Sequence, residues 1–240
     1  MNAPSLTIPI RGPSLTGCNG DITVGDRVRI PSSVCDFESF ALWTHSGNYP
    51  ERGGVAYLDG EIWVDLTMEE LITHNLVKSE FAFAIMSALR ENPVGEFIAD
   101  RMLLTNATAQ LSTEPDGMVL SWQSLESSRV QAIAGKEHGF IELRGSPDLA
   151  LEIVSDSSRR KDFVTLRDLY FQAGVDEYWL VDVRGDTPYF RILTRGDDQF
   201  HAASEGDWQT SPLLCREFQL VRQLDPKRHA RYTVEWRVIS

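Results

Sequence analysis

Two carboxylates lie in a segment that otherwise has the pattern of a buried strand, between Gly145 and Ser155. Gly145 and Pro147 are typical of a turn, and the residues after them are apolar apart from two acids, Asp148 and Glu152. Side chains alternate between the faces of a strand, so the two acids share one face. The opposite face is entirely apolar and consists of Leu149, Leu151 and Ile153.

A charged Glu152 inside an apolar strand costs several kcal/mol unless a cation, strong hydrogen-bond donors or a metal ion compensate it. Two interpretations are open. Glu152 is a functional carboxylate in a cleft, or it is a structural acid that an arginine holds or that faces solvent from an edge strand.

The elements after the acidic strand favour the cleft. Residues 155–158 are typical helix-cap residues, apolar residues recur at helical spacing from Lys161 to Ala173, and Gly174 is a typical helix end. Residues 177–183 are again strand-like, because aromatic and β-branched residues dominate them. Strand, helix and strand form a βαβ unit, which predicts a parallel pair with the acidic strand in the interior of the sheet.

These residues resemble the Uma-type restriction endonuclease family of the PD-(D/E)XK nuclease superfamily. The similarity is carried by Pro147-Asp148-Leu149, by Glu152-Ile153-Val154-Ser155, by Tyr170 and by the segment Ala173–Asp182. It extends upstream to Tyr57–Glu61, His74 and Glu114-Pro115-Asp116, and it covers roughly residues 36–193. The Gly-Val-x-Glu-Tyr-Trp segment is its most specific part.

The resemblance implies a metal-dependent endonuclease that hydrolyses DNA phosphodiester bonds. It assigns Asp116 and Glu152 as ligands of Mg²⁺ or Mn²⁺, and both residues as catalytic. Two carboxylates from neighbouring strands suit Mg²⁺, which prefers hard oxygen ligands and keeps several waters. Asp148 lies roughly 13 Å from Glu152 along an extended strand, too far to share one ion, and is interpreted as a turn residue.

The lysine of the superfamily is missing from its expected positions. Val154 stands two residues after Glu152, and Leu166 stands where Uma-type proteins carry a lysine on the following helix. Lys161 and Arg167 are the nearest cations. We assign Lys161 as the catalytic cation, because its long stem can reach the cleft from the helix start, and we keep Arg167 as an additional candidate.

Two further residues are candidates for the site. Glu61 follows the hairpin turn Asp59-Gly60 on a strand, where it forms a site wall or an ordinary outward-facing acid. His74 lies on the flank of an apolar helix stripe, where a histidine is more often a hydrogen-bonded core-edge residue. The resemblance places a histidine there, so His74 is retained.

The expected fold is α/β, with a restriction-endonuclease-like mixed sheet flanked by helices. The centre of the sheet should include residues 117–121, 148–154 and 177–183, and a helix over 68–91 should pack on one face. Residues 1–34 are interpreted as an irregular N-terminal extension, and residues 35–240 as the nuclease-like domain with a β-rich C-terminal part.

Composition limits the partners. The net charge of −12 opposes a broad DNA-coating surface, although a local basic groove remains compatible with it. Arg159-Arg160-Lys161 with Arg167 forms such a group, or a solvated helix start. Three scattered cysteines, no apolar run approaching roughly 18 residues and no signal peptide predict a cytoplasmic protein without a membrane segment. A homodimer is compatible with the sequence.

Two functions therefore remain open. One is a metal-dependent endonuclease, which the acids and His74 favour. The other is a catalytically degenerate nuclease-fold protein that acts as a binding or scaffold partner, which the missing lysine and the acidic charge favour. A small-molecule enzyme on the same βαβ core lacks a Gly-rich phosphate loop.

Overall fold

A computed structural model describes residues 7–11, 20–25, 28–50, 54–68, 70–99, 101–135 and 139–239 of the chain. A six-stranded mixed sheet lies at its centre, with the strand order β15-β14-β13-β12-β9-β6. Its strands are β6 (Gly95–Ala99), β9 (Gly117–Ser121), β12 (Leu149–Ile153), β13 (Glu177–Asp182), β14 (Tyr189–Arg195) and β15 (Phe200–Ala202). The strands expected at the centre of the sheet are therefore neighbours in it.

The expected βαβ unit is present. β12 and β13 run parallel, and Leu149 pairs with Glu177 at their start. Between them the chain forms a π-helical turn, η2 (Lys161–Leu166), that continues into α4 (Arg167–Ala173). Gly174 ends this helix with φ of 92°, a left-handed conformation that costs glycine little because it has no Cβ.

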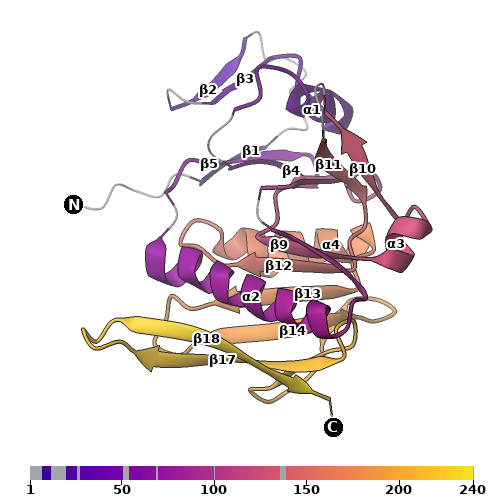
Figure 1. Cartoon of the computed structure of the whole chain (residues 1–240). Coiled ribbons are helices and arrows are strands. Elements are labelled where there is room, and N and C mark those ends of the chain that lie inside the picture. Colours follow the sequence, from indigo (N-terminus) through magenta and orange to yellow (C-terminus); the bar gives the residue numbers. More distant parts are fainter. Residues whose placement is uncertain are drawn as a thin grey trace.

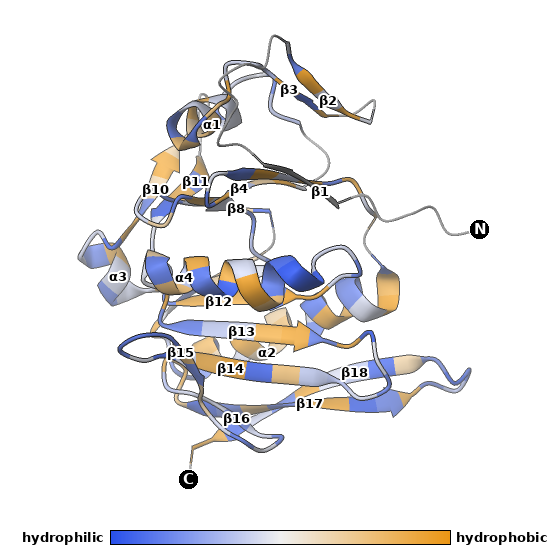
Figure 2. Ribbon diagram, turned by 180° about the vertical axis from the view of Figure 1, so that it is seen from behind, coloured by the Kyte–Doolittle hydropathy of each residue, from blue (hydrophilic) through white to orange (hydrophobic). Residues whose placement is uncertain are grey.

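The alternation predicted for β12 is confirmed by how its two faces pack. Leu149, Leu151 and Ile153 join a core with α2, and Ala150 and Val154 join a second core with α4. Glu152 lies between the last two, so its side chain enters the α4 side of the sheet. Figure 2 views the molecule from this side and shows β12 as largely apolar and α4 with apolar and polar residues in turn.

The helix expected over 68–91 starts later than the sequence predicts. It begins with a π-helical turn, η1 (Leu71–Asn75), and continues as α2 (Leu76–Glu91). The carboxylate of Glu70 caps this start by accepting hydrogen bonds from the Thr73 backbone N–H and, at 2.7 Å, from the Thr73 hydroxyl. Glu69, within the expected helix, lies outside the described residues.

A second large sheet, which the sequence pattern does not indicate, covers the α4 side of the molecule (Figure 1). It has the order β1-β5-β4-β8-β7-β11-β10 and seven strands. They are β1 (Thr7–Arg11), β4 (Gly54–Leu58), β5 (Glu61–Asp65), β7 (Leu103–Asn106), β8 (Leu111–Thr113), β10 (Val130–Ala134) and β11 (Phe140–Gly145).

The remaining elements complete the layers. A three-stranded sheet of β16 (Gln209–Ser211), β17 (Arg216–Leu224) and β18 (Ala230–Val238) packs beside α2, and α3 (Trp122–Glu126) follows β9. Within the expected N-terminal extension, 1–34, the described residues form β1 and the hairpin of β2 (Ile22–Val24) and β3 (Val28–Ile30), near α1 (Phe37–Thr44). No helix in the described ranges is long and apolar enough to span a membrane.

Candidate active site

The candidate site lies at the end of the six-stranded sheet where β12 finishes and β9 begins. β9 is antiparallel to β12, and Gly117 pairs with Leu151, so Asp116 comes level with the C-terminal end of β12. The backbone N–H of Ile153 donates a 2.7 Å hydrogen bond to Oδ2 of Asp116. This bond fixes the Asp116 carboxylate next to the residue that follows Glu152. The sequence separates these two acids by more than thirty residues, and the antiparallel pairing brings them together.

Two side chains from η1 and the start of α2 point at Asp116. Lys78 Nζ lies 3.0 Å from Oδ1, and His74 Nε2 lies 3.6 Å from Oδ2. All three side chains are largely buried, because Asp116 is 11% exposed and Lys78 and His74 are each 12% exposed. Both helical residues lie one turn apart on the same flank, which explains why they reach the same carboxylate.

Glu152 is buried beneath α4. Its Oε1 accepts a 2.6 Å hydrogen bond from the hydroxyl of Tyr170, which is itself fully buried. Burial raises the pKa of Glu152 well above its ordinary value, Lys161 opposes this shift, and Asp162 and Asp116 add to it. Burial also raises the pKa of Tyr170, and the neighbouring Glu152 adds to that shift. Tyr170 therefore stays protonated and remains a donor to Glu152.

Lys161 and Asp162 enter the site from the π-helical turn η2. Lys161 Nζ lies 3.3 Å from Oδ1 of Asp162, whose side chain is 1% exposed. Burial lowers the pKa of Lys161, but Asp162, Glu152 and Asp116 outweigh it and hold this pKa above its ordinary value. A lysine held protonated in this way cannot take a proton from water, so it acts as a fixed positive charge. π-Helical turns are frequent at functional sites, and here one presents two adjacent side chains to the same acids.

Four of the residues named from the sequence thus converge, namely Asp116, Glu152, Lys161 and His74. The other two candidates lie elsewhere. Arg167 donates a 3.0 Å hydrogen bond to the backbone carbonyl of Phe200 in the edge strand β15. Glu61 lies at the start of β5, opposite Leu58.

Asp65, at the far end of the same strand as Glu61, reaches the loop beside the site. Its Oδ2 accepts a 2.6 Å hydrogen bond from Ser157. Asp65, Trp63, Ser157 and Lys161 are among the residues that line a small cavity of about 100 Å³ between the seven-stranded sheet and the segment that follows β12. Lys161 therefore has access to space beside the buried acids.

Lys78, Asp162 and Tyr170 complete the site and were not assigned to it from the sequence. Lys78 stands four residues after His74, and Tyr170 stands in the helix stripe over the acidic strand, so spacing could have identified both. Asp162 is adjacent to Lys161 but gave no signal, because an acid in a first helical turn is common for electrostatic reasons.

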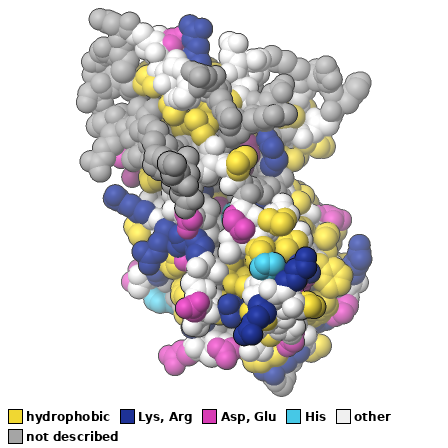
Figure 3. Space-filling view, turned by 90° about the vertical axis from the view of Figure 1, so that its left-hand side faces the viewer, with side chains coloured by type: hydrophobic (Ala, Val, Ile, Leu, Met, Phe, Trp, Pro, Cys, Tyr) yellow, Lys and Arg dark blue, Asp and Glu magenta, His cyan; other side chains and the backbone are white. Residues whose placement is uncertain are grey.

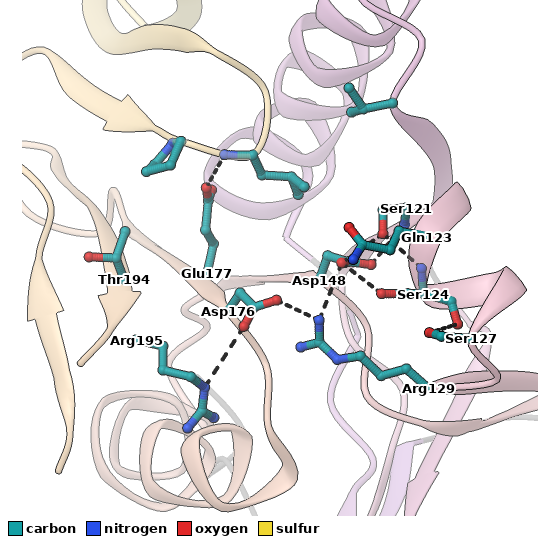
Figure 4. Close-up of a pocket in the computed structure, with 13 residues that line it drawn as sticks. Ser121, Gln123, Ser124, Ser127, Arg129, Asp148, Asp176, Glu177, Thr194 and Arg195 are labelled. Carbon is teal, nitrogen blue, oxygen red and sulfur yellow. Dashed lines mark hydrogen bonds and ion pairs between the residues drawn. The ribbon is translucent and has the colours of Figure 1, made fainter. Parts of the chain in front are cut away.

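A larger cavity of about 750 Å³ lies at the opposite end of the six-stranded sheet, away from Asp116 and Glu152 (Figure 4). There the carboxylate of Asp148, 7% exposed, accepts hydrogen bonds from the backbone and hydroxyl of Ser121 at 2.7 and 2.8 Å and from the Ser124 hydroxyl at 2.8 Å. Arg129 lies 3.4 Å from Asp148 and 2.6 Å from Asp176. The Asp148 carboxylate therefore accepts four hydrogen bonds, from Ser121, Ser124 and Arg129, and we interpret Asp148 as structural.

We expect Asp148→Asn to lower the free energy of unfolding by about 2–4 kcal/mol, because an amide nitrogen would face a donor and Arg129 would lose its buried partner. Asp176→Asn is the matched control, because Asp176 also pairs with Arg129 but is 47% exposed, and we expect it to cost less than about 1 kcal/mol. Urea unfolding followed by circular dichroism measures both. Equal losses would contradict the structural assignment of Asp148.

The donor set of the candidate site suits a hard divalent ion. Asp116 and Glu152 offer carboxylate oxygens near one another, and a Mg²⁺ ion held by two carboxylates completes its shell with waters and phosphate oxygens. Among the described residues, no group of three or more His, Cys, Asp or Glu side chains is arranged to hold a metal ion. A site with two protein carboxylates is therefore the arrangement to test.

The model of the Uma2 family, described as "Putative restriction endonuclease", matches residues 38–223. The chain belongs to this family. The match spans the acidic strand, the βαβ unit and both helical segments that supply the converging side chains. The Uma2 assignment agrees with the resemblance carried by the residues around Asp116 and Glu152.

A solved structure has the same fold. It is described as "a putative nuclease belonging to DUF820" from Anabaena variabilis, and it superposes with a TM-score of 0.52 over 75% of this chain and 90% of that chain. At 19% sequence identity, the likeness establishes the fold alone. No curated protein shows significant similarity to this Uma2 chain.

Proposed function

We propose that this protein is a divalent-metal-dependent nuclease that hydrolyses DNA phosphodiester bonds. The observation that carries the proposal is the convergence of Asp116, Glu152 and a protonated Lys161 at one end of the central sheet. Two carboxylates can hold a divalent ion that activates water and polarises a phosphate, and a nearby cation can stabilise the charge that develops on the phosphate. Membership of a family described as "Putative restriction endonuclease" supports the same function.

Each side chain has a separate role in this proposal. Asp116 and Glu152 would hold Mg²⁺ or Mn²⁺, which polarises a phosphate and lowers the pKa of a bound water. The N–H of Ile153 and the hydroxyl of Tyr170 orient the two carboxylates. Lys161 supplies positive charge where negative charge grows on the phosphate. The reaction adds one water across one P–O bond and needs no oxidant or reductant.

A second function, a catalytically degenerate binding protein, is favoured by one specific contact. Lys78 Nζ lies 3.0 Å from Asp116, so an ammonium group already compensates an oxygen that a metal ion would need. Leu166, at the position of the family lysine, is fully buried in the core around α4. In this alternative, Lys78 and Lys161 neutralise the acids permanently and no ion binds.

Incubation of the purified protein with supercoiled plasmid and with circular single-stranded DNA distinguishes the two functions. We expect strand cleavage with Mg²⁺ or Mn²⁺ and none with excess EDTA. Isothermal calorimetry with Mn²⁺ in the absence of DNA should show binding of the ion. If neither substrate is cut with either metal and Mn²⁺ does not bind, the degenerate function is correct.

A further inference from the structure

Four side chains beside the candidate site form a continuous row of contacts between rings and guanidinium groups, in which the planes of the two rings are tilted by 51°. The Arg159 guanidinium lies 5.5 Å from the ring centre of Phe163, the rings of Phe163 and Tyr189 lie 5.3 Å apart, and the Arg191 guanidinium lies 5.6 Å from the ring centre of Tyr189. We call these four residues the stacking platform. Its members come from the helix start after β12 and from β14.

The platform lies at the same end of the sheet as the acids. Phe163 follows Asp162 directly within η2. Tyr189 pairs with Asp182 at the C-terminal end of β13, which is the parallel neighbour of β12. Figure 3 views the side of the molecule that lies on the left of Figure 1 and shows Lys and Arg side chains there together with acidic side chains. A ligand on the platform would therefore continue toward Lys161.

The guanidinium groups of the platform have few internal partners: Arg191 donates a 2.8 Å hydrogen bond to the backbone carbonyl of Phe190, and the charge of Arg159 helps to lower the pKa of Asp182. Across the described ranges, neither Arg159 nor Arg191 forms a salt bridge, whereas nearby Arg184 is held by Asp182 at 2.7 Å and by Asp156 at 3.3 Å. Arg159 is exposed, and Tyr189 is 37% exposed. Phe163 is partly buried against the core under α4. Aromatic rings and guanidinium groups together are the two kinds of group that a single-stranded nucleic acid uses.

We propose that the stacking platform binds single-stranded DNA and presents it to the candidate site. This inference rests on the proposed nuclease function. Unpaired bases can stack on Phe163 and Tyr189, while Arg159 and Arg191 reach the phosphates on either side. Bases in a duplex have no free faces for such stacking. Duplex binding instead depends on neutralising many phosphates, which the net charge of −12 opposes.

Binding is tested without catalysis, by fluorescence anisotropy of a labelled 12-nucleotide DNA strand in EDTA. Tyr189→Leu, which removes the ring but keeps an apolar side chain, is expected to weaken binding by about tenfold. Tyr189→Phe keeps the ring and should bind as tightly as the wild type. Arg159→Ala should reduce the slope of log K against log salt by about 0.7, because one phosphate contact is lost.

The matched controls lie on other surfaces. Phe140→Leu removes an aromatic ring that is 62% exposed in β11, and Arg90→Ala removes an exposed arginine near the end of α2. Both should bind the strand as the wild type does. Because Arg159 is exposed, Arg159→Ala keeps its fold and remains decisive if Tyr189→Leu proves unstable.

Three results would overturn the inference. The first is that the wild type binds a blunt duplex or single-stranded RNA more tightly than the DNA strand. The second is that Phe140→Leu and Tyr189→Leu lose equal affinity for the DNA strand. The third is that Arg159→Ala leaves the affinity and the salt slope unchanged. The two proposals fail separately. Strand binding in EDTA without cleavage in Mg²⁺ would refute the nuclease and leave the platform, whereas metal-dependent cleavage that Tyr189→Leu leaves unchanged would refute the platform alone.

Discussion

Glu152→Gln is expected to reduce metal-dependent DNA cleavage by about 10³-fold, because one of two protein ligands is lost and the ion supplies several kcal/mol of transition-state stabilisation. The same variant should unfold at the same temperature as the wild type or higher. Glu152 is 3% exposed, and a glutamine keeps its shape and its acceptor for Tyr170 without burying a charge. Cleavage rates on circular single-stranded DNA and thermal melts in EDTA measure the two effects.

Asp116→Asn provides the second half of this test. Its amide oxygen can still accept from the Ile153 N–H, so the fold should persist while calorimetric Mn²⁺ binding is lost. Glu142→Gln is the matched control, because Glu142 is equally buried but pairs with His45, at 2.5 Å, away from the acids. Full activity in Glu152→Gln with weakened stability would assign this acid to the structure instead of to catalysis.

The local pattern of β12 was sufficient to predict where Glu152 would lie. A shift of one residue in the register of a strand exchanges its two faces. Because Leu149, Leu151 and Ile153 face the core with α2, Glu152 must lie on the opposite face. The sequence also predicts that β13 lies beside β12, because two parallel strands need a crossover connection and the sequence shows a helix between them. Short-range periodicity is therefore sufficient to predict the unit of β12, α4 and β13.

The second large sheet could not be predicted in the same way. β7 and β11 are parallel neighbours in it, although about 35 residues and the strand β9 of the other sheet separate them. Nothing in the local pattern tells a strand which sheet it will join, since both sheets use the same alternation. The helix start was misplaced for a related reason. The side chain that caps the helix is that of Glu70, which accepts from the Thr73 N–H, and only the structure shows this bond.

The local sequence pattern also does not predict which cationic side chains reach the site. Arg167 and Lys161 are both close to Glu152 in sequence, yet Arg167 bonds to Phe200 on the edge strand while Lys161 turns toward the acids. Lys78 reaches Asp116 from a helix nearly forty residues away. The direction of a side chain on a helix depends on about 100° of rotation for each residue, and a π-helical turn changes that rotation locally.

Lys161→Met is expected to lower metal-dependent cleavage by about 10²- to 10³-fold, as the loss of a preorganised charge beside a developing oxyanion does. The site would then hold Asp116, Glu152 and Asp162 with Lys78 as the remaining lysine near them. Arg160→Met, one residue earlier and exposed, is the matched control and should retain its cleavage rate. Equal rates in Lys161→Met and the wild type would reduce Lys161 to a structural partner of Asp162.

The family position supplies the final test, because Leu166 lies one helical turn before Tyr170, whose hydroxyl contacts Glu152. A lysine at position 166 should direct its ammonium group toward Glu152 and Asp162. These carboxylates would compensate its buried charge, whereas an apolar core would not. The double variant Lys161→Met and Leu166→Lys should therefore recover at least about tenfold of the lost rate, because the restored charge again faces the phosphate. Leu166→Arg in the same background is the control, as a larger planar group does not fit the space of a fully buried leucine. A folded double variant that still binds Mn²⁺ and stays as slow as Lys161→Met would show that the position of the charge, and not its presence, limits the reaction.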